Sequence, residues 1–597
     1  MTPPTATHAR SEPRDHPRPL RDYALVADGE RGALVGPDGD YVWLCAPRWD
    51  SPSLFGALIG AGGAYALAPT APYVWGGHYE EGSLVWRSRW ITRDAGGVEC
   101  REALAFPGDP HRAVILRRVL AQEEPVAMRA LLEPAGGFGH ERVRDATLDE
   151  HGVWHARAGD LRLRWSGAAG AHFHDGRFTL DLRATPGRPA DLVLEVSDRP
   201  FDGPPPDPDR AWRATEAAWR RAVPAISGTL ADREARFAYA VMRGLTGSGG
   251  GMVAAATTSL PERAEEGRNY DYRYVWIRDQ CYAGQAAAAL GGCALLDDAV
   301  RFVSARLLAD GPALAPAYTV DGLSIPGQRQ LELPGYPGGF DIVGNRVNRQ
   351  FQLDAFGECL LLLAAAARHD RLDAEGWKAA RTAADAVARR WHEPDAGIWE
   401  LDARAWTHSR LICAAGLRAL AGATGAGAEA AGWSSLAERI VADTERHALH
   451  PSGRWQRSPE DEALDASLLL PALRGAIPGD DPRTVATLDA YRAALTDDHL
   501  AYRFRHDDRP LAQAEGAFVM CGFVMALAEG QQGRTTAAHR WFDRNRATCG
   551  PAGLHSEEYD AVQRQMRGNL PQAFVHAFLL ESAVRLAQDG PAPGAPS

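Results

Sequence analysis

Hydrophobic and polar positions alternate with period two in the first third of the chain. Stretches such as GALVGPDGDYVWLCAP, SLVWRSRWITR and RFTLDLRATPG place Val, Trp, Leu and Arg at alternating positions, and Gly, Pro and Asp separate these stretches. Such alternation between turn residues is typical of half-buried antiparallel strands. The pattern therefore predicts an antiparallel β-sandwich over residues 20–200.

The pattern changes near residue 225. A Pro-rich stretch, 201–228, is predicted to be a linker. Beyond it, Ala- and Leu-rich segments at helical spacing, such as FQLDAFGECLLLLAAAARHD and QAFVHAFLLESAVRLAQ, predict an all-α domain over 229–588. Long loops rich in Tyr, Trp, Arg, Asp and Gly join these segments, and rigid helices commonly position loop residues for chemistry. The two ends, 1–19 and 589–597, are predicted to be disordered tails.

Composition narrows the classes of partner. The chain has 597 residues, which is too long for one ordinary core, and 45% of them are hydrophobic and 24% charged, as in globular proteins. A net charge of -12 without a long basic run argues against nucleic acid as a partner. No apolar run approaches the ~20 residues of a membrane span, and the N-terminal segment lacks the apolar core of a signal peptide. From these features we expect a cytoplasmic protein without a membrane partner.

The eight cysteines are scattered singly, with no Cys-x-x-Cys pair and no zinc-finger spacing. Cys359 and Cys413 lie inside apolar helical runs, where a free thiol packs like a small hydrophobic side chain. Reduced, buried cysteines are therefore predicted, although an even number would also suit disulfides in a secreted protein.

Several common catalytic motifs do not occur in the sequence. It has no HExxH, no P-loop lysine motif and no Gly-x-Ser-x-Gly elbow. A glycine cluster, GALIGAGGAYA at 56–66, lacks the preceding strand and following helix of a dinucleotide site. We interpret it as a turn near the start of the β domain.

The segment NYDYRYVWIRDQ (269–280) carries the strongest local signal. Aromatic residues alternate there with Asp and Arg at the start of a predicted helix. Sugars suit such a surface, because their C–H faces stack on aromatic rings while Asp and Arg bind hydroxyls. Composition alone fits equally well a helix start built from aromatic residues and ion pairs.

Two other segments contain candidate acid and base groups. Glu400 lies between Trp399 and Leu401, and apolar surroundings would raise its pKa and suit a general acid. Glu557 begins a Glu-Glu-Tyr run, where a polar loop would keep it ionised and suit a general base. The chain has 77 acidic residues, however, and a single Glu is more often a surface or helix-cap residue.

A resemblance selects among these candidates. The stretches AAATTSLPE, NYDYRYVWIRD, LPGY, GNRVNRQFQLDAFGE, GIWE, DASLLLPAL, EGAF, SEEYD and GNLPQAFVH occur in this order. In these motifs the chain resembles glycoside hydrolase family 15, the family of glucoamylases, glucodextranases and bacterial trehalases. The resemblance covers nearly the whole chain, from the RDYALVADGERGALVGPDGDYVWLCAPRWDSPSLF stretch onward.

The resemblance implies an N-terminal β-sandwich and a C-terminal (α/α)6 barrel whose loops form a pocket. It implies that Glu400 of GIWE is the general acid and Glu557 of SEEYD the general base, with Glu558 as the second candidate. It implies no metal and no other cofactor. The positions that it implies bind or line the sugar are Tyr272, Trp276, Arg278, Asp279, Trp399, Phe518 and, with less support from the motifs, Arg503.

Inverting chemistry requires room for a water between the two carboxyl groups, which should then lie ~6.5–9.5 Å apart. A separation of ~5 Å would instead suit a retaining mechanism with a covalent intermediate.

Three positions depart from the pattern of bacterial relatives. In GGFDIVGN (338–345), Ile342 occupies a place where arginine is usual, and Asp341 adds a charge. In SRLICA (409–414), Ala414 replaces a tryptophan. The resemblance places these residues near the leaving-group sugar, so the preference for that group stays open.

We therefore expect an exo-acting α-glucoside hydrolase that inverts the anomeric centre and releases β-glucose from the non-reducing end of its substrate. Its substrate is a small α-glucoside, either trehalose or a short α-1,4- or α-1,6-linked glucan. The alternatives are a non-catalytic carbohydrate-binding protein on the same scaffold, or a sugar phosphorylase that yields glucose 1-phosphate. The sequence does not determine the oligomeric state.

Overall fold

The structure is a computed structural model that describes residues 17–93, 96–264, 266–425 and 427–588, and it divides into two compact units. The first unit contains residues up to Ala222 with Glu332–Asp341 and Gly550–Leu554, and the second contains the remainder. Residues 1–16 and 589–597, which hold most of the predicted tails, lie outside the described residues. The predicted N-terminal tail was too long at its inner end, because Arg18 forms an ion pair with Asp38 at 2.6 Å.

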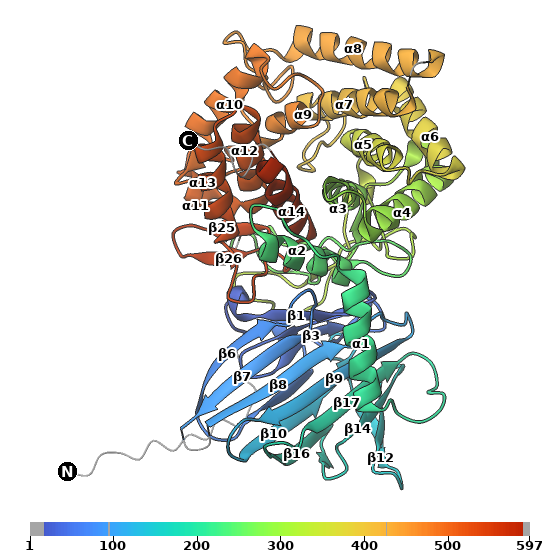
Figure 1. Ribbon diagram of the computed structural model, residues 1–597, viewed down its shortest axis with the longest axis vertical. Coiled ribbons are helices and arrows are strands. Elements are labelled where there is room, and N and C mark those ends of the chain that lie inside the picture. Colours follow the sequence, from blue (N-terminus) through green and yellow to red (C-terminus); the bar gives the residue numbers. More distant parts are fainter. Residues whose placement is uncertain (1–16, 94–95, 265, 426, 589–597) are drawn as a thin grey trace, which may run out of the picture. The chain divides into compact units, whose positions relative to one another are not determined.

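The first unit contains two antiparallel sheets, whose strands run side by side in Figure 1. One sheet has the order β1-β2-β3-β5-β10-β16-β15, with β4 beside β3, and the other has the order β11-β12-β13-β14-β17-β9-β8-β7-β6. The strands are β1 (Ala24–Ala27), β2 (Gly32–Val35), β3 (Tyr41–Cys45), β4 (Ser53–Phe55), β5 (Ala64–Pro69), β6 (Tyr73–Tyr79), β7 (Trp86–Thr92), β8 (Gly96–Leu104), β9 (Arg112–Ala121), β10 (Val126–Glu133), β11 (Ala135–Gly136), β12 (Glu141–Leu148), β13 (Trp154–Ala158), β14 (Leu161–Ser166), β15 (His172–His174), β16 (Arg177–Ala184) and β17 (Ala190–Ser197).

The alternation in the sequence accounts for these sheets. In β7, Trp86, Ser88, Trp90 and Thr92 are buried, whereas the residues between them are exposed or half-buried. Successive side chains of a strand point to opposite faces, so one face of β7 packs inward against the other sheet. The predicted antiparallel β-sandwich is confirmed.

The segment predicted as a linker contains a helix. α1 (Pro208–Ala222) begins at a proline, which suits the first helical position because its missing N–H has no partner there. Trp212, Thr215 and Trp219 are buried at helical spacing, and the Trp219 ring stacks on Phe106 with centroids 4.0 Å apart. The linker prediction was therefore wrong for these residues, because the Pro-rich stretch before Pro208 obscured the amphipathic pattern that follows.

The second unit is built mainly from helices, which are labelled in Figure 1. They are α2 (Asp232–Leu245), α3 (Ile277–Ala289), α4 (Ala294–Asp310), α5 (Asp354–Arg368), α6 (Ala374–Arg390), α7 (Thr407–Thr424), α8 (Ala428–Ala448), α9 (Leu470–Leu473), α10 (Pro482–Ala494), α11 (Leu511–Ala514), α12 (Val519–Gln531), α13 (Thr535–Arg546) and α14 (Ala573–Gln588). The 3₁₀ turn η5 (Ala466–Leu469) leads into α9.

Six of these helices form a closed inner ring. α3 contacts α5, α5 contacts α7, α7 contacts α9, α9 contacts α12, α12 contacts α14, and α14 contacts α3. The remaining long helices, α2, α4, α6, α8, α10 and α13, pack outside this ring. In α5, every residue from Asp354 to Ala366 is buried, as expected for a helix covered on all sides. The arrangement is the predicted (α/α)6 barrel.

Two further predictions are tested by the fold. Six of the eight cysteines are buried, as the prediction of packed thiols expects. None of the described helices combines the length and the apolar character that a membrane span requires.

Candidate active site

A cavity of about 480 Å³ lies in the second unit at the N-terminal ends of the inner helices. Its size falls in the range usual for small-molecule sites. Its lining includes Asp279 in the first turn of α3, Phe518 immediately before α12 and Gln572 immediately before α14. Both candidate carboxylates, Glu400 and Glu557, line it.

Two aromatic residues that precede α3 each donate a hydrogen bond to one of the two carboxylates. The Tyr272 hydroxyl donates a hydrogen bond to Glu557 Oε1 at 3.1 Å, and the Trp276 indole N–H donates to Glu400 Oε1 at 2.8 Å. The two rings pack edge to face with centroids 5.4 Å apart. This aromatic pair therefore holds one oxygen of each carboxylate at fixed places on the cavity wall.

Glu400 ends a tight turn that precedes α7. Its backbone φ is +58°, a left-handed conformation that is uncommon for residues other than glycine, and its N–H donates to Gly397 O at 3.2 Å. Functional sites often hold residues in such conformations, because the surrounding structure enforces them. From this turn Glu400 lines the cavity.

The surroundings of Glu400 differ from those expected. Its side chain is 30% exposed, and Oε1 lies 3.5 Å from Arg278 Nη2 in addition to the Trp276 N–H. The purely apolar surroundings predicted from Trp399 and Leu401 were therefore wrong, because polar groups of α3 and of the residue before it also contact Glu400, although Trp399 and Leu401 line the same cavity.

Glu557 is almost fully buried, with 3% of its surface exposed. Oε1 accepts from Tyr272, and Oε2 has no hydrogen-bond partner among the described residues. Burial raises the pKa of Glu557 well above its ordinary value, and the neighbouring Glu262 carboxylate raises it further. The expectation of a polar loop that simply keeps Glu557 ionised was wrong, because tertiary packing removes water from this side chain.

Arg278 and Asp279 begin α3 beside Glu400. Arg278 Nη1 donates to Gln352 Oε1 at 2.9 Å and lies 3.5 Å from Asp354 Oδ2. Burial raises the pKa of Asp279 to about 7, an effect that Arg278 opposes and Glu400 reinforces. Both residues line the cavity and present charge-assisted hydrogen-bonding groups to it.

The opposite part of the wall is aromatic. Trp399 and Phe518 line the cavity and pack edge to face with ring centroids 5.4 Å apart, and the Arg503 guanidinium lies 4.6 Å from the centre of the Phe518 ring. The Trp399 N–H donates to Asp465 Oδ1 at 2.6 Å, which fixes the orientation of the indole.

Glu558 lies elsewhere. Fully buried, it does not line the cavity, and its carboxylate lies 3.0 Å from Arg503 Nη2 and accepts from the Gly516 N–H at 3.0 Å. Neighbouring residues on an extended segment point to opposite sides, so Glu557 and Glu558 cannot both face a sugar. Glu558, the second candidate for the general base, therefore supports Arg503 and does not border the cavity.

The comparisons with known proteins agree with this geometry. The family model described as "Glycosyl hydrolases family 15" matches residues 239–584, which is more than half of the chain. The chain belongs to glycoside hydrolase family 15. The model described as "Trehalase-like, N-terminal" matches residues 14–155 of this family member.

Curated relatives of this family 15 chain extend over its whole length. It is 32% identical to a trehalase of Mycolicibacterium smegmatis over 95% of this chain and 91% of that protein. It is 31% identical to a trehalase of Mycobacterium tuberculosis over 98% of this chain and 92% of that protein. A solved bacterial glucoamylase, complexed with acarbose, shares the fold, with a TM-score of 0.69 at 12% identity over 98% of this chain and 96% of that one.

Several cavity residues were not chosen from the sequence. The family 15 motifs AAATTSLPE and GNRVNRQ were recognised, but no residue in them was selected. The polar and aromatic side chains that the structure adds to the lining include Glu262, Arg268, Tyr270, Gln328, Asn345, Arg346, Gln350, Phe504, His506, Gln572 and Phe574. Except for Phe574 in the first turn of α14, they come from segments between the long helices, whose approach to one another depends on the closed ring and not on any local spacing.

The departures from the family 15 pattern lie outside the cavity wall. Asp341, Ile342 and Ala414 do not line it. The Asp341 carboxylate accepts from the Leu333 N–H, and the Ile342 carbonyl accepts from the Thr258 and Ser259 hydroxyls. Asp341 and Ile342 therefore stabilise loops, and Ala414 is buried within α7, so none of the three borders the described cavity.

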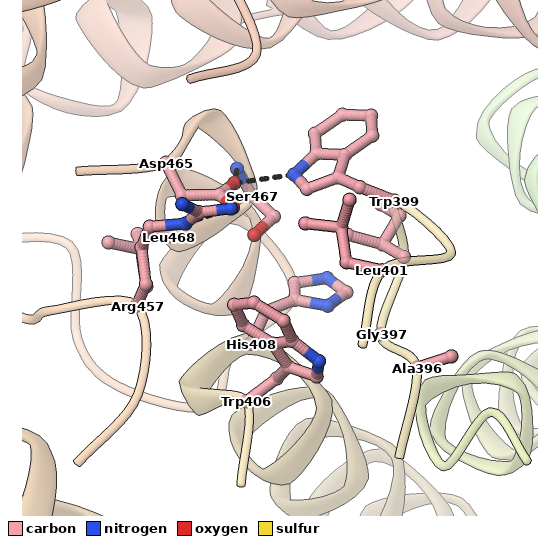
Figure 2. Close-up of a pocket in the computed structure, with 11 residues that line it drawn as sticks. Ala396, Gly397, Trp399, Leu401, Trp406, His408, Arg457, Asp465, Ser467 and Leu468 are labelled. Atoms are coloured by element: carbon pink, nitrogen blue, oxygen red, sulfur yellow. Dashed lines mark hydrogen bonds and ion pairs between the residues drawn. The ribbon is translucent and has the colours of Figure 1, made fainter. Parts of the chain in front are cut away.

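A second, much smaller cavity of about 10 Å³ lies beside the turn that carries Glu400. Figure 2 shows the His408 imidazole in this cavity, between Trp406 and Leu401, with Trp399 bound to Asp465 above it. His408 is 2% exposed, and neither ring nitrogen has a hydrogen-bond partner among the described residues. Burial, together with a smaller effect of the nearby Arg278, lowers the pKa of His408 to about 3.

Because His408 is buried in its neutral form, we expect the folded protein to lose stability in acid. The folded pKa of His408 lies below its unfolded value of 6.5, so its contribution is complete above pH 6.5 and is lost as the pH falls toward 3. In a His408→Gln variant, the loss of unfolding free energy between pH 7 and pH 5 should be smaller than in the wild type by about 2 kcal/mol. Urea unfolding followed by tryptophan fluorescence at both pH values measures this difference.

The matched control is His447→Gln, because the His447 side chain is 52% exposed. It should retain the full pH dependence of the wild type. Equal pH dependence in the His408→Gln variant and the wild type would contradict the buried, neutral state of His408.

Proposed function

We propose that this family 15 glycoside hydrolase is a trehalase that cleaves its substrate with inversion. The observation that carries the proposal is one cavity lined by two carboxylates, Glu400 and Glu557, each held by one member of an aromatic pair. The trehalase names of relatives that match over nearly the full chain support trehalose as the substrate.

Glu557 acts as the general base in this proposal. Its Oε1 is held by Tyr272, which leaves Oε2 to accept a proton from an attacking water. A carboxylate with a raised pKa is a better proton acceptor near neutral pH than an ordinary one. The Tyr272 hydroxyl orients the carboxylate through its hydrogen bond to Oε1.

Glu400 acts as the general acid. Its carboxyl group is the more exposed of the two, so a substrate bound in the cavity can contact it directly. It then donates its proton to the glycosidic oxygen as the bond to the anomeric carbon breaks. The Trp276 N–H fixes Oε1, so the proton is delivered from Oε2.

Arg278 and Asp279 bind hydroxyls of the sugar that is attacked, while Trp399, Phe518 and Tyr272 cover its C–H faces. Water adds to the anomeric carbon on the face opposite the departing oxygen. The water loses one proton to Glu557, and the leaving glucose gains one from Glu400, so the two roles balance over one turnover.

The proposal predicts the products. From trehalose, the attacked glucose should appear first as the β-anomer and the leaving glucose as the α-anomer, in equal amounts, as followed by ¹H NMR before mutarotation. Parallel reactions with maltose, isomaltose and maltotetraose test the choice of substrate. Hydrolysis of these glucans without hydrolysis of trehalose would reject the trehalase proposal and support an enzyme acting on glucans.

A phosphate-dependent reaction is tested in the same assay. Turnover that requires added phosphate and yields glucose 1-phosphate would identify a phosphorylase. Binding of sugars without turnover would identify a carbohydrate-binding protein.

We also propose a cytoplasmic location. The free thiols of Cys281, Cys359 and Cys413, buried in inner helices, support a reducing compartment. Fractionation of cells followed by immunodetection tests this location.

A further inference from the structure

Glu262 lines the cavity next to Glu557, although nothing in the proposed reaction uses it. It is 3% exposed and follows the TTSLP stretch. Its backbone N–H donates to Arg268 O at 2.9 Å, and the Gly568 N–H donates to Pro261 O at 2.9 Å. These bonds tie the loop of Glu262 to the segment that follows β26 (Gln565–Arg567).

The two glutamates lie against the same glycine. A Cβ atom placed on Gly568 would lie 3.2 Å from Glu557 Oε2 and 3.7 Å from Glu262 Cγ. Gly568 has a φ of +77°, a conformation that glycine adopts readily. The absence of a side chain at this position therefore lets both glutamates approach the same point of the cavity wall.

Arg503, the positively charged side chain near Glu557, forms its ion pairs with other carboxylates. Arg503 Nη2 lies 3.1 Å from Glu262 Oε2 and 3.0 Å from Glu558 Oε1, and it also contacts Glu515. His506 Nε2 lies 3.1 Å from Glu515 Oε1. Among the described residues, no arginine, lysine or histidine forms an ion pair with Glu557.

We propose that Glu262 is a positioning residue for the general base: its carboxylate, set against Gly568 beside Glu557, makes Glu557 a stronger proton acceptor through repulsion between like charges. This inference rests on the proposed role of Glu557. Arg503 neutralises only part of the charge of the three carboxylates that contact it. The negative charge that remains acts on the fourth carboxylate, Glu557.

The pKa of Glu557 is shifted in the direction that this proposal requires. Burial is the largest cause of the raised pKa of Glu557, Glu262 is the next, and Arg503 and the Tyr272 hydroxyl act in the opposite direction. Among the ionisable neighbours, Glu262 therefore makes the largest contribution that raises the pKa. The charged or titratable groups near Glu557 on the surrounding elements are Glu262, Tyr270, Tyr272, Asp279, Glu400, Arg503 and Glu558.

The test is the pH dependence of kcat/KM for α-glucosyl fluoride in a Glu262→Gln variant. Fluoride departs without a proton, so the acidic limb of this profile reports the base of the free enzyme. The limb should move to lower pH by about one unit or more, because the like charge has been removed. Glu262→Ala is a second neutral variant, in case Glu262→Gln does not fold.

The matched control is Glu515→Gln. It removes another carboxylate from Arg503, but Glu515 does not border the cavity and is not among the largest influences on the pKa of Glu557. Its acidic limb should stay at the wild-type pH. An unmoved limb in the Glu262 variants, or an equal shift in Glu515→Gln, would overturn the inference, since the second result would assign the effect to Arg503.

The assay separates this inference from the choice of substrate. A wild type that hydrolyses α-glucosyl fluoride but not trehalose contradicts the trehalase proposal and leaves the role of Glu262 fully testable. A wild type that hydrolyses neither contradicts both.

Discussion

Replacing Glu557 with Gln is expected to lower kcat on trehalose by about 10³-fold or more, because general base catalysis is lost while the shape of the side chain is kept. The amide retains an oxygen that accepts from the Tyr272 hydroxyl, so the cavity wall should remain in place. KM should change much less than kcat, since the sugar is bound mainly by other residues.

The adjacent Glu558→Gln variant is the matched control. Glu558 is buried and polar but does not line the cavity, and a Gln oxygen still accepts from the Gly516 N–H. Its kcat should fall far less than that of Glu557→Gln. Steady-state kinetics with circular dichroism of each variant measures the difference, and a larger loss in Glu558→Gln would reverse the assignment of the base.

Replacing Glu400 with Gln should produce a loss that depends on the leaving group. On trehalose, kcat should fall by about 10³-fold, because the glycosidic oxygen then departs without a proton. On α-glucosyl fluoride, whose leaving group needs no proton, activity should remain within about tenfold of the wild type. The Glu557→Gln variant, by contrast, should lose activity on both substrates.

This contrast distinguishes the acid from the base. Asp402→Asn is the matched control, because Asp402 is exposed and lies two residues after Glu400 in the same loop. It should leave both rates close to wild type. If Glu400→Gln lost both activities equally while Glu557→Gln lost only the activity on trehalose, the two roles would have to be exchanged.

The alternation of side chains predicted the strands of the first unit well, because burial of one sheet face acts on every second residue of a strand. It failed at α1. The buried positions Trp212, Thr215 and Trp219 have helical spacing, but the prolines that precede them suggested a linker.

The electrostatics of the site could not be predicted from sequence neighbours. Trp399 and Leu401 flank Glu400, yet its carboxylate lies beside Arg278 and the Trp276 N–H. Glu557 belongs to a polar run, yet it is 3% exposed. A left-handed residue and a closed ring of helices decide these environments, and neither is encoded in the two or three adjacent residues.

By itself, the sequence determined the order of a β-rich and a helical region, and its motifs identified the family and the two carboxylates. Those features depend on local periodicity or on residue identity, which a linear pattern contains. Only the tertiary structure decided that Glu558 faces Arg503, that Glu262 stands beside Glu557, and that His408 is buried without a partner. These facts depend on loops from distant parts of the chain meeting at one end of the barrel, and burial and charge at such a meeting point are set by all of them together.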